Sequence, residues 1–149
     1  MIQKYFDEIE IGEKATSRGR TITEGDIVNF CAFTGDWYPL HSDLEYAKKS
    51  PFKQRIAHGM LVLSVASGLV PLEPGTIVAF YGMDRVRFAN PTFIGDTIHV
   101  ESEVLEKDVK DEMTGVLTVK QHVVKQDGLV AASIVLKVLL MRKPPPGLG

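Results

Sequence analysis

The sequence predicts an α+β fold in which a curved antiparallel sheet wraps around a central buried helix. The first observation behind this prediction is the stretch 58–70, which has no charged side chain after His58 and is apolar on every side. A helix of this kind is normally enclosed by protein, and at roughly 13 residues it is too short to cross a bilayer, which takes about 20. The second observation is that four long β-type segments follow, so helices come first and strands afterwards.

The N-terminal part is expected to lead into the fold through an irregular segment, residues 5–12. Residues 14–23 are polar and rich in Thr, Arg and Ser, which is typical of an edge strand. Thr23 is placed to cap a helix whose first turn is acidic and whose apolar residues continue at helical spacing through Thr34. Gly35 is suited to end that helix in the left-handed conformation.

The middle part carries a loop and a short helix ahead of the central one. Residues 36–41 contain Pro39 and are expected to be too short and too broken for regular structure. The segment 43–49 starts with an aspartate that can cap a short helix. Pro71 then limits the far end of the central helix, because proline cannot continue the hydrogen-bond ladder.

The C-terminal half alternates long segments of Val, Ile, Phe and Thr with turn residues. Asp127-Gly128 is a strong hairpin signal, and partial alternation of apolar residues indicates an antiparallel sheet with one covered face. Residues 143–149, with three consecutive prolines, are expected to form a flexible tail. The predicted strands are 77–88, 96–107, 115–125 and 129–141.

The composition indicates one ordinary globular domain spanning residues 1–149. Hydrophobic residues make up 44% and charged residues 24% of the chain. A net charge of -2 without a long Lys/Arg run gives no electrostatic footprint for nucleic acid or an anionic membrane. The single cysteine, Cys31, excludes an internal disulfide and a cysteine-based metal site. Because the N-terminal stretch has no apolar secretory segment, the expected location is cytoplasmic.

Asp36 and His41 are the residues best suited to acid–base chemistry. They lie in one tight loop just after a helix terminus, and a carboxylate within hydrogen-bond reach of an imidazole can move protons. The spacing alone is common, and both residues could equally serve the backbone turn. Gly59 strengthens the chemical interpretation, because a bare helix N-terminus presents N–H groups to a developing negative charge.

Two ordered motifs carry a more specific signal. Residues 34–43 read Thr-Gly-Asp-Trp-Tyr-Pro-Leu-His-Ser-Asp and residues 55–61 read Arg-Ile-Ala-His-Gly-Met-Leu, and together they resemble the MaoC-like dehydratase family, which includes the (R)-specific enoyl-CoA hydratases. The similarity continues through residues 81–88 and 91–98 and back to 20–23. The resemblance implies a hot-dog fold, in which a long sheet wraps a central helix, and usually a dimer with pockets near the subunit interface.

The resemblance also assigns roles by position. Asp36 and His41 match the catalytic pair that activates water for addition to an enoyl thioester, and Gly59 matches the residue whose backbone N–H receives the thioester carbonyl. Ser67 matches a serine that supports the catalytic loop, although a helix serine often bonds only to a carbonyl one turn earlier. His58 is expected to orient the start of the helix rather than to transfer protons. Neither a metal nor an organic cofactor is implied.

Tyr38 is the one departure from the pattern, which commonly has Asn two residues after the catalytic Asp. Tyrosine still donates a hydrogen bond but is bulkier and reaches further, so Tyr38 bears on which acyl group is accepted.

These residues predict a hydro-lyase of fatty acid metabolism that converts a 2-enoyl-CoA reversibly to the (R)-3-hydroxyacyl-CoA. The expected partners are an acyl-CoA thioester as substrate and further copies of the chain in a homodimer or higher homo-oligomer. Two alternatives stay open. A hot-dog acyl-CoA thioesterase would direct water to the thioester carbon, and a non-catalytic acyl-CoA-binding or regulatory module would retain the pocket without turnover.

Overall fold

The computed structural model describes residues 2–144, so most of the predicted tail, residues 145–149, lies outside the described residues. The elements run in the order η1 (Phe6–Glu8), β1 (Lys14–Thr16), β2 (Arg20–Thr21), α1 (Glu24–Thr34), α2 (Pro39–Ser42), α3 (Leu44–Lys49), α4 (Gly59–Leu69), β3 (Ile77–Phe88), β4 (Thr97–Val109), β5 (Thr114–Lys125) and β6 (Val130–Met141). Among these, no helix combines the length and the apolar character that crossing a bilayer demands.

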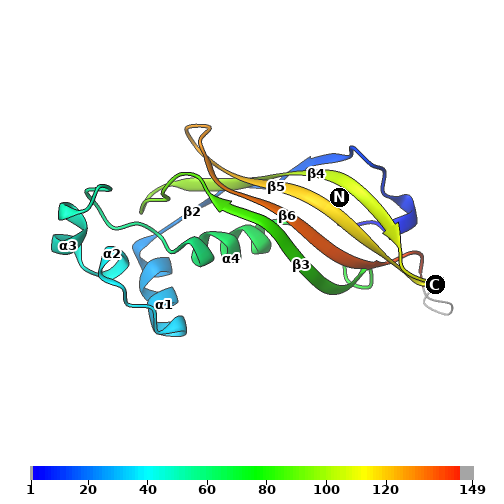
Figure 1. The fold of residues 1–149 in the computed structure, drawn as a ribbon, viewed down its shortest axis with the longest axis horizontal. Helices are drawn as coiled ribbons and strands as arrows, with labels where there is room; N and C mark the ends of the chain where they lie inside the picture. The colour runs from blue at the N-terminus through cyan, green and yellow to red at the C-terminus, as the bar shows by residue number, and fades with distance from the viewer. Residues whose placement is uncertain (1, 145–149) are drawn as a thin grey trace.

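The strands form a single antiparallel sheet in the order β1-β4-β5-β6-β3, with β2 also pairing to β4. The four long strands agree with the predicted ones to within two residues at each end, and Gly128 takes the positive φ that the predicted hairpin needs. Figure 1 shows the sheet curving over α4, while α1, α2 and α3 gather beyond one end of it. The α+β expectation of a curved antiparallel sheet on a central helix is confirmed.

The main core lies between α4 and the sheet. Buried side chains of α4 join those of α1 and of the strands β4, β5 and β6 in one cluster, which includes Ile27, Cys31, Leu61, Val62, Val65, Leu69, Ile98, Val100, Val123 and Ile134. A second cluster packs η1 against the other end of the sheet through Phe6, Ile9, Val104, Leu117, Val119, Val138 and Leu140. The first cluster fixes the start of α4 against the sheet, and that start is where the site lies.

The helix boundaries follow the predicted signals. Thr23 caps α1 by accepting the N–H of Asp26, whose carboxylate accepts the N–H of Thr23 in return. Gly35 ends α1 at φ 77°, in the left-handed region. Asp43 caps α3 by accepting the N–H of Tyr46. Gly35 at the end of α1 and Asp43 at the start of α3 therefore fix the two ends of the segment between these helices.

Three expectations are wrong in detail. Residues 39–42 do form a helical turn, because Pro39 stands at its first position, where a fixed φ is favourable and no N–H is required. The predicted edge strand is two short strands, because the hydroxyl of Ser17 accepts the N–H of Val100 where a backbone carbonyl would continue the ladder. The segment 5–12, expected to be irregular, contains the short helix η1.

The expected enclosure of α4 on every face is also wrong for the single chain. Met60 is 57% exposed, and Ser64 and Ser67 are exposed on the same side. Within residues 2–144 the sheet does not close around the helix, and β3, the edge strand on that side, has only β6 as a neighbour. An apolar face of α4 therefore stays open beside the edge of the sheet.

Candidate active site

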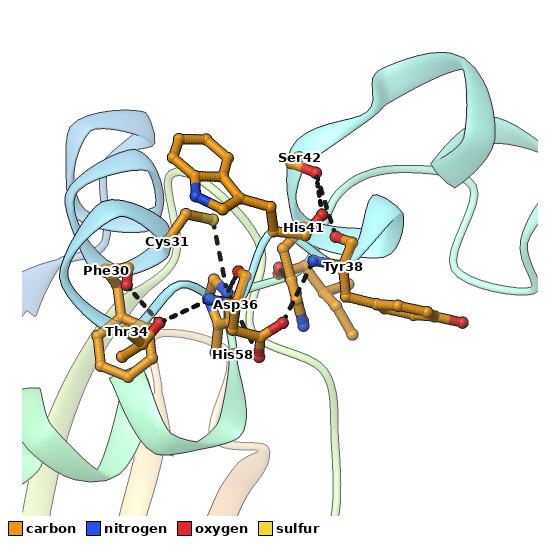
Figure 2. A network of polar contacts seen from close by, with 10 residues as sticks. Phe30, Cys31, Thr34, Asp36, Tyr38, His41, Ser42 and His58 are labelled. Carbon is orange, nitrogen blue, oxygen red and sulfur yellow. Dashed lines mark hydrogen bonds and ion pairs between the residues drawn. The ribbon is translucent and has the colours of Figure 1, made fainter.

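Three segments meet at the N-terminal end of α4. The loop after α1 brings Asp36, the turn α2 brings His41, and the residue before α4 is His58. One nitrogen or carboxylate oxygen from each of the three lies within 4.8 Å of the others. Figure 2 shows the three side chains converging from these separate segments. Asp36 and His41, which sequence reasoning paired, are thus close neighbours.

Asp36 is held by hydrogen bonds of its own loop. Its N–H donates to the hydroxyl of Thr34 at 3.2 Å, and its Oδ1 accepts the N–H of Tyr38 at 3.2 Å. The hydroxyl of Thr34 in turn donates to the carbonyl of Phe30 in the last turn of α1. The Asp36 side chain stays 52% exposed, so its carboxylate is oriented by the backbone and remains open to a small molecule.

His41 is fixed as one tautomer by a backbone carbonyl. Its Nδ1 lies 2.7 Å from the carbonyl oxygen of Ile56, which can only accept, so Nδ1 carries the hydrogen and Nε2 keeps the lone pair. Burial, the strongest influence, lowers the pKa of His41 below its ordinary value of 6.5, and His58 acts in the same direction. The hydrogen bond to Ile56 and the charge of Asp36 oppose that shift. The imidazole is therefore a neutral base near neutral pH.

His58 joins the start of α4 to the loop. Its ring is 3% exposed, and Nε2 donates to the carbonyl oxygen of Asp36 at 3.0 Å. The ring also stacks on that of His41, with centroids 3.8 Å apart and an interplanar angle of 26°. Among the described atoms, Nδ1 of His58 is buried and has no hydrogen-bond partner. His58 stands at the N-cap of α4 without a side-chain cap hydrogen bond, so its expected orienting role stays a prediction.

The same three side chains do not suit one metal ion. An imidazole lone pair lies in the ring plane, and the rings of His41 and His58 are stacked, so their lone pairs run side by side rather than toward a shared point. One nitrogen of each ring is already engaged by a backbone carbonyl. The arrangement favours proton transfer over metal binding.

The start of α4 borders an open cleft of about 550 Å³. No side chain caps this helix, and the first N–H groups of an α-helix have no partner within it. Gly59 and His41 line the cleft together with Phe52, Ile56, Met60, Phe88, Asn90, Pro91 and Thr92. The cleft therefore has a base on one wall and free N–H donors at the helix start.

The glycine at position 59 has a packing cause that the sequence did not reveal. A Cβ placed on Gly59 would lie 2.7 Å from Cε1 of Phe88 and 2.8 Å from Cζ, closer than real side chains approach. The space beside its Cα is therefore filled by the Phe88 ring rather than open to a ligand. Any larger residue here would displace either that ring or the start of α4.

A second cavity of about 270 Å³ lies along the open face of α4. Its lining is almost wholly apolar and comes from α4, β3, β5 and β6, with Met60, Leu63, Ser64, Ser67, Val70, Phe80, Met83, Ile134, Leu136 and Val138 among its residues. Met60 lines both the cleft and this cavity. The almost wholly apolar cavity thus adjoins the cleft that contains His41, with the Met60 side chain between them.

Ser67 lies apart from the histidine pair, whereas Tyr38 borders it. Ser67 is eight residues beyond Gly59, about 12 Å along the helix. Its hydroxyl donates to the carbonyl of Ser64 at 2.8 Å, the local bond that sequence reasoning left open. Tyr38 is 54% exposed, its hydroxyl lies 3.3 Å from that of Tyr46, and its ring meets the His41 ring edge-on at 6.2 Å. The structure does not bring Ser67 to the Asp36 loop.

Sequence reasoning missed two parts of the site, Phe88 and the carbonyl of Ile56. Phe88 ends a predicted strand and lies in a motif quoted for the resemblance, but only the fold places it against Gly59. A backbone carbonyl has no side-chain signature at all, so no pattern of residue types could have identified the acceptor for His41.

Comparisons with known proteins place the chain in a family. Residues 8–126 match the family described as the MaoC like domain. The protein MaoC of Klebsiella aerogenes is 40% identical over 111 residues, which cover 74% of this chain and 33% of that protein. An (R)-specific enoyl-CoA hydratase of Rhodospirillum rubrum is 37% identical over 98 residues, covering 66% of this chain and 67% of that enzyme. The chain spans about a third of the length of the first of these relatives.

Solved structures extend the likeness to the fold. A monoamine oxidase regulatory protein from Archaeoglobus superposes with a TM-score of 0.89 at 42% identity, covering 97% of this chain and all of the other. A Mycobacterium tuberculosis protein described as having a double hotdog fold superposes with a TM-score of 0.80 at 21% identity, covering 98% of this chain and 46% of the other. The expected hot-dog fold is confirmed.

Proposed function

The chain belongs to the MaoC-like domain family, and from that premise we propose that it is an (R)-specific enoyl-CoA hydratase. The family includes hydratases and dehydratases, which supports a hydro-lyase. The proposed reaction is the reversible addition of water to a 2-enoyl-CoA thioester, giving the (R)-3-hydroxyacyl-CoA. One observation carries the proposal: a neutral imidazole with a free Nε2 and the uncapped start of α4 line one cleft, and the Asp36 carboxylate lies within 4.8 Å of a nitrogen of that imidazole.

The proposed mechanism gives His41, Asp36 and Gly59 each one role in the addition of water. Nε2 of His41 takes a proton from a water molecule held between it and the Asp36 carboxylate, and the water oxygen bonds to the β-carbon of the enoyl group. Negative charge develops on the thioester oxygen, where the N–H of Gly59 stabilises it. Return of the proton to the α-carbon completes the addition. Dehydration is the same path in reverse.

The apolar cavity along α4 supports an acyl thioester as the substrate. Its lining offers little to a polar ligand, and Met60 connects it to the cleft that holds the acid–base pair. A substrate with its carbonyl at Gly59 would place its acyl chain toward this cavity. A volume of about 270 Å³ favours a chain of moderate length over a long one.

We also propose that the chain forms a homodimer through β3. This strand is twelve residues long and its outer edge has no neighbour in the described chain, and an exposed edge invites a further strand. Apolar side chains are exposed along it, namely Val78, Phe80, Tyr81 and Met83. Two copies of β3 would continue the sheet across a two-fold axis. Elution at about twice the chain mass in size-exclusion chromatography with light scattering would support this assembly, and a single-chain mass would refute it.

Two other functions would use the same pocket. A thioesterase would direct the water to the thioester carbon, and a non-catalytic module would bind an acyl-CoA without turnover. The second alternative is favoured by one specific observation, the regulatory function in the name of the 42%-identical Archaeoglobus protein. The presence of both Asp36 and His41, with a carboxylate oxygen and a ring nitrogen within 4.8 Å of each other, favours catalysis over either a vestigial pocket or simple binding.

One experiment separates the three. The purified chain is mixed with crotonyl-CoA, and both the enoyl-thioester absorbance and free thiol are followed. Loss of absorbance without thiol, with product oxidised by an (R)-specific but not an (S)-specific 3-hydroxyacyl-CoA dehydrogenase, is the expected result. Thiol release would establish the thioesterase, and saturable binding without either change would establish the binding module.

A further inference from the structure

A buried ion pair lies behind the cleft, and the proposed reaction does not use it. Lys125, at the end of β5, is 5% exposed, and its Nζ lies 2.9 Å from Oδ2 of Asp96 and 3.1 Å from the carbonyl oxygen of Pro91. The Lys125 ammonium also lies over the Phe93 ring, 5.2 Å from its centroid. Buried charges are costly unless they are paired and hydrogen-bonded, so such a pair calls for an explanation.

Asp96 ties the loop that carries it into a fixed shape. Oδ2 accepts the N–H of Phe93 at 2.8 Å, and Oδ1 accepts Nε2 of Gln126 at 2.7 Å. Burial alone would raise the pKa of the Asp96 carboxyl, but the hydrogen bonds and the Lys125 charge outweigh it and hold the pKa below its ordinary value. Asp96 is therefore ionised at neutral pH, and residues 91–96 are held at both ends by one pair of charges.

The same loop supports the backbone that fixes His41. Phe93 forms an isolated antiparallel bridge with Ile56, and the N–H of Ala57 donates to the carbonyl of Thr92 at 2.8 Å. The carbonyl of Ile56 is the acceptor for Nδ1 of His41. A continuous set of contacts thus runs from the ion pair, through residues 91–93 and 56–57, to the nitrogen that sets the tautomer of the proposed base.

We propose that Lys125 and Asp96 are positioning residues for His41, holding the loop 91–96 so that the Ile56 carbonyl keeps the hydrogen on Nδ1 and the lone pair on Nε2. Neither touches the cleft in the role of acid, base or donor. The pair acts on the orientation and the tautomer of the imidazole. Its importance to catalysis rests on the proposed function, but its effect on the tautomer does not.

The test replaces the pair without leaving a lone charge. In the double variant Lys125→Met/Asp96→Asn, the asparagine still accepts from Phe93, while the Pro91 carbonyl loses its donor and the loop loses its charge-assisted bond. The ring nitrogens of His41 are then observed by ¹⁵N NMR, with the four histidines assigned by single His→Gln variants. The wild type is expected to show one hydrogen, on Nδ1. The double variant is expected to show exchange between both tautomers.

Steady-state kinetics of the double variant test the proposal independently of the NMR measurement. A small misplacement of a catalytic group can cost a large factor in rate, so kcat for crotonyl-CoA hydration is expected to fall about tenfold in the double variant while KM changes less than about twofold. The control is Val119→Ala, which weakens the second core cluster away from this loop and is expected to change neither the tautomer nor kcat. Hydration absent from the wild type would count against the proposed function and leave the NMR result valid.

A single Nδ1–H tautomer together with unchanged kcat in a folded double variant would overturn the proposal. So would a tautomer shift of the same size in Val119→Ala, because the effect would then follow general loosening of the fold. Should the double variant not fold, Asp96→Glu alone is measured by the same criteria, since it keeps a charge opposite Lys125 but displaces the carboxylate that accepts the N–H of Phe93.

Discussion

The two ends of α4 face different surroundings although the helix is eleven residues long. At its N-terminal end, the helix meets two stacked imidazoles, a carboxylate and the open cleft. Further along, its open face meets methyl and methylene groups of β3, β5 and β6 around Ser67. The difference teaches that one rigid element can separate proton transfer from recognition of an apolar chain. Mutations near the start should then change turnover, and mutations further along should change substrate preference.

The strongest test of that division removes the acid–base pair. Asp36→Asn and His41→Ala are each expected to lower kcat for crotonyl-CoA hydration by about 10²–10⁴, the range typical of general acid–base catalysis. Because Asp36 is half exposed and His41 half buried, neither change creates a large core cavity, and thermal unfolding should stay close to that of the wild type. Near-normal turnover in either folded variant would show that the substituted residue is not needed for catalysis.

Gly59→Ala tests the helix start itself. The added methyl would meet the Phe88 ring at 2.7 Å, so we expect turnover to fall by about 10²–10³, as when one oxyanion donor is lost. The free energy of unfolding should fall by about 1–3 kcal/mol from overpacking. The matched control is Gly59→Ala combined with Phe88→Leu, which makes room and should recover most of that stability. Full activity in Gly59→Ala alone would show that the Phe88 ring yields to the methyl while the start of α4 keeps its position, and would contradict the expected loss of turnover.

The pH dependence of kcat/KM sharpens the role of His41. Its pKa is lowered below 6.5 chiefly by burial, and only the neutral imidazole accepts a proton. Activity should therefore be retained through pH 6.5 and decline about tenfold per unit at still lower pH. The same shift means that the unfolded state binds a proton before the folded one, so stability is also lost as pH falls below 6.5. An acid limb centred above 6.5 would contradict the assignment.

Ser67→Leu tests the other end of the helix. A larger apolar side chain should fill part of the 270 Å³ cavity and raise KM for a longer enoyl-CoA about tenfold, since a methylene or two in an apolar pocket has roughly this effect. Turnover of crotonyl-CoA should be nearly unchanged. A matching loss of kcat with the short substrate would instead support the catalytic-loop role that the resemblance assigns to Ser67.

Tyr38→Phe is expected to have the smallest effect. The variant removes only an exposed hydroxyl that contacts Tyr46, and the ring that meets His41 is kept. Steady-state measurements with crotonyl-CoA should show less than about a threefold change, because an exposed hydrogen bond contributes little. A larger loss would mean that the hydroxyl reaches the substrate.

The elements with strong local signals could be predicted from the sequence. Thr23 and Gly35 bound α1 where capping chemistry predicted, and the long strands followed their β-branched content and turn residues. The turn at Pro39 was missed because proline opens a helix as readily as it interrupts one. The open face of α4 was missed because an apolar sequence does not distinguish a core from a cavity or a surface covered by another chain.

Within the site, the sequence predicted the side chains that suit the chemistry but not the groups that hold them in position. Asp36, His41 and Gly59 were predicted because their residue types suggest the chemistry; His41 and Gly59 line one cleft, Asp36 lies beside His41, and their catalytic roles stay predictions. The Ile56 carbonyl, the Phe88 ring and the Lys125–Asp96 pair were not found, because their contribution depends on contacts between segments 15 to 34 residues apart. Such contacts are set by the sheet and its loops, and no local pattern records them.

The contact between Phe88 and Gly59 links two properties that are usually measured separately. Phe88 is the last residue of β3, the strand whose free edge is proposed to join two copies, and its ring rests on the first residue of α4. Separating the copies would therefore loosen the wall of the reaction cleft itself. Specific activity per chain should then fall on dilution, at the same concentration at which the dimer dissociates.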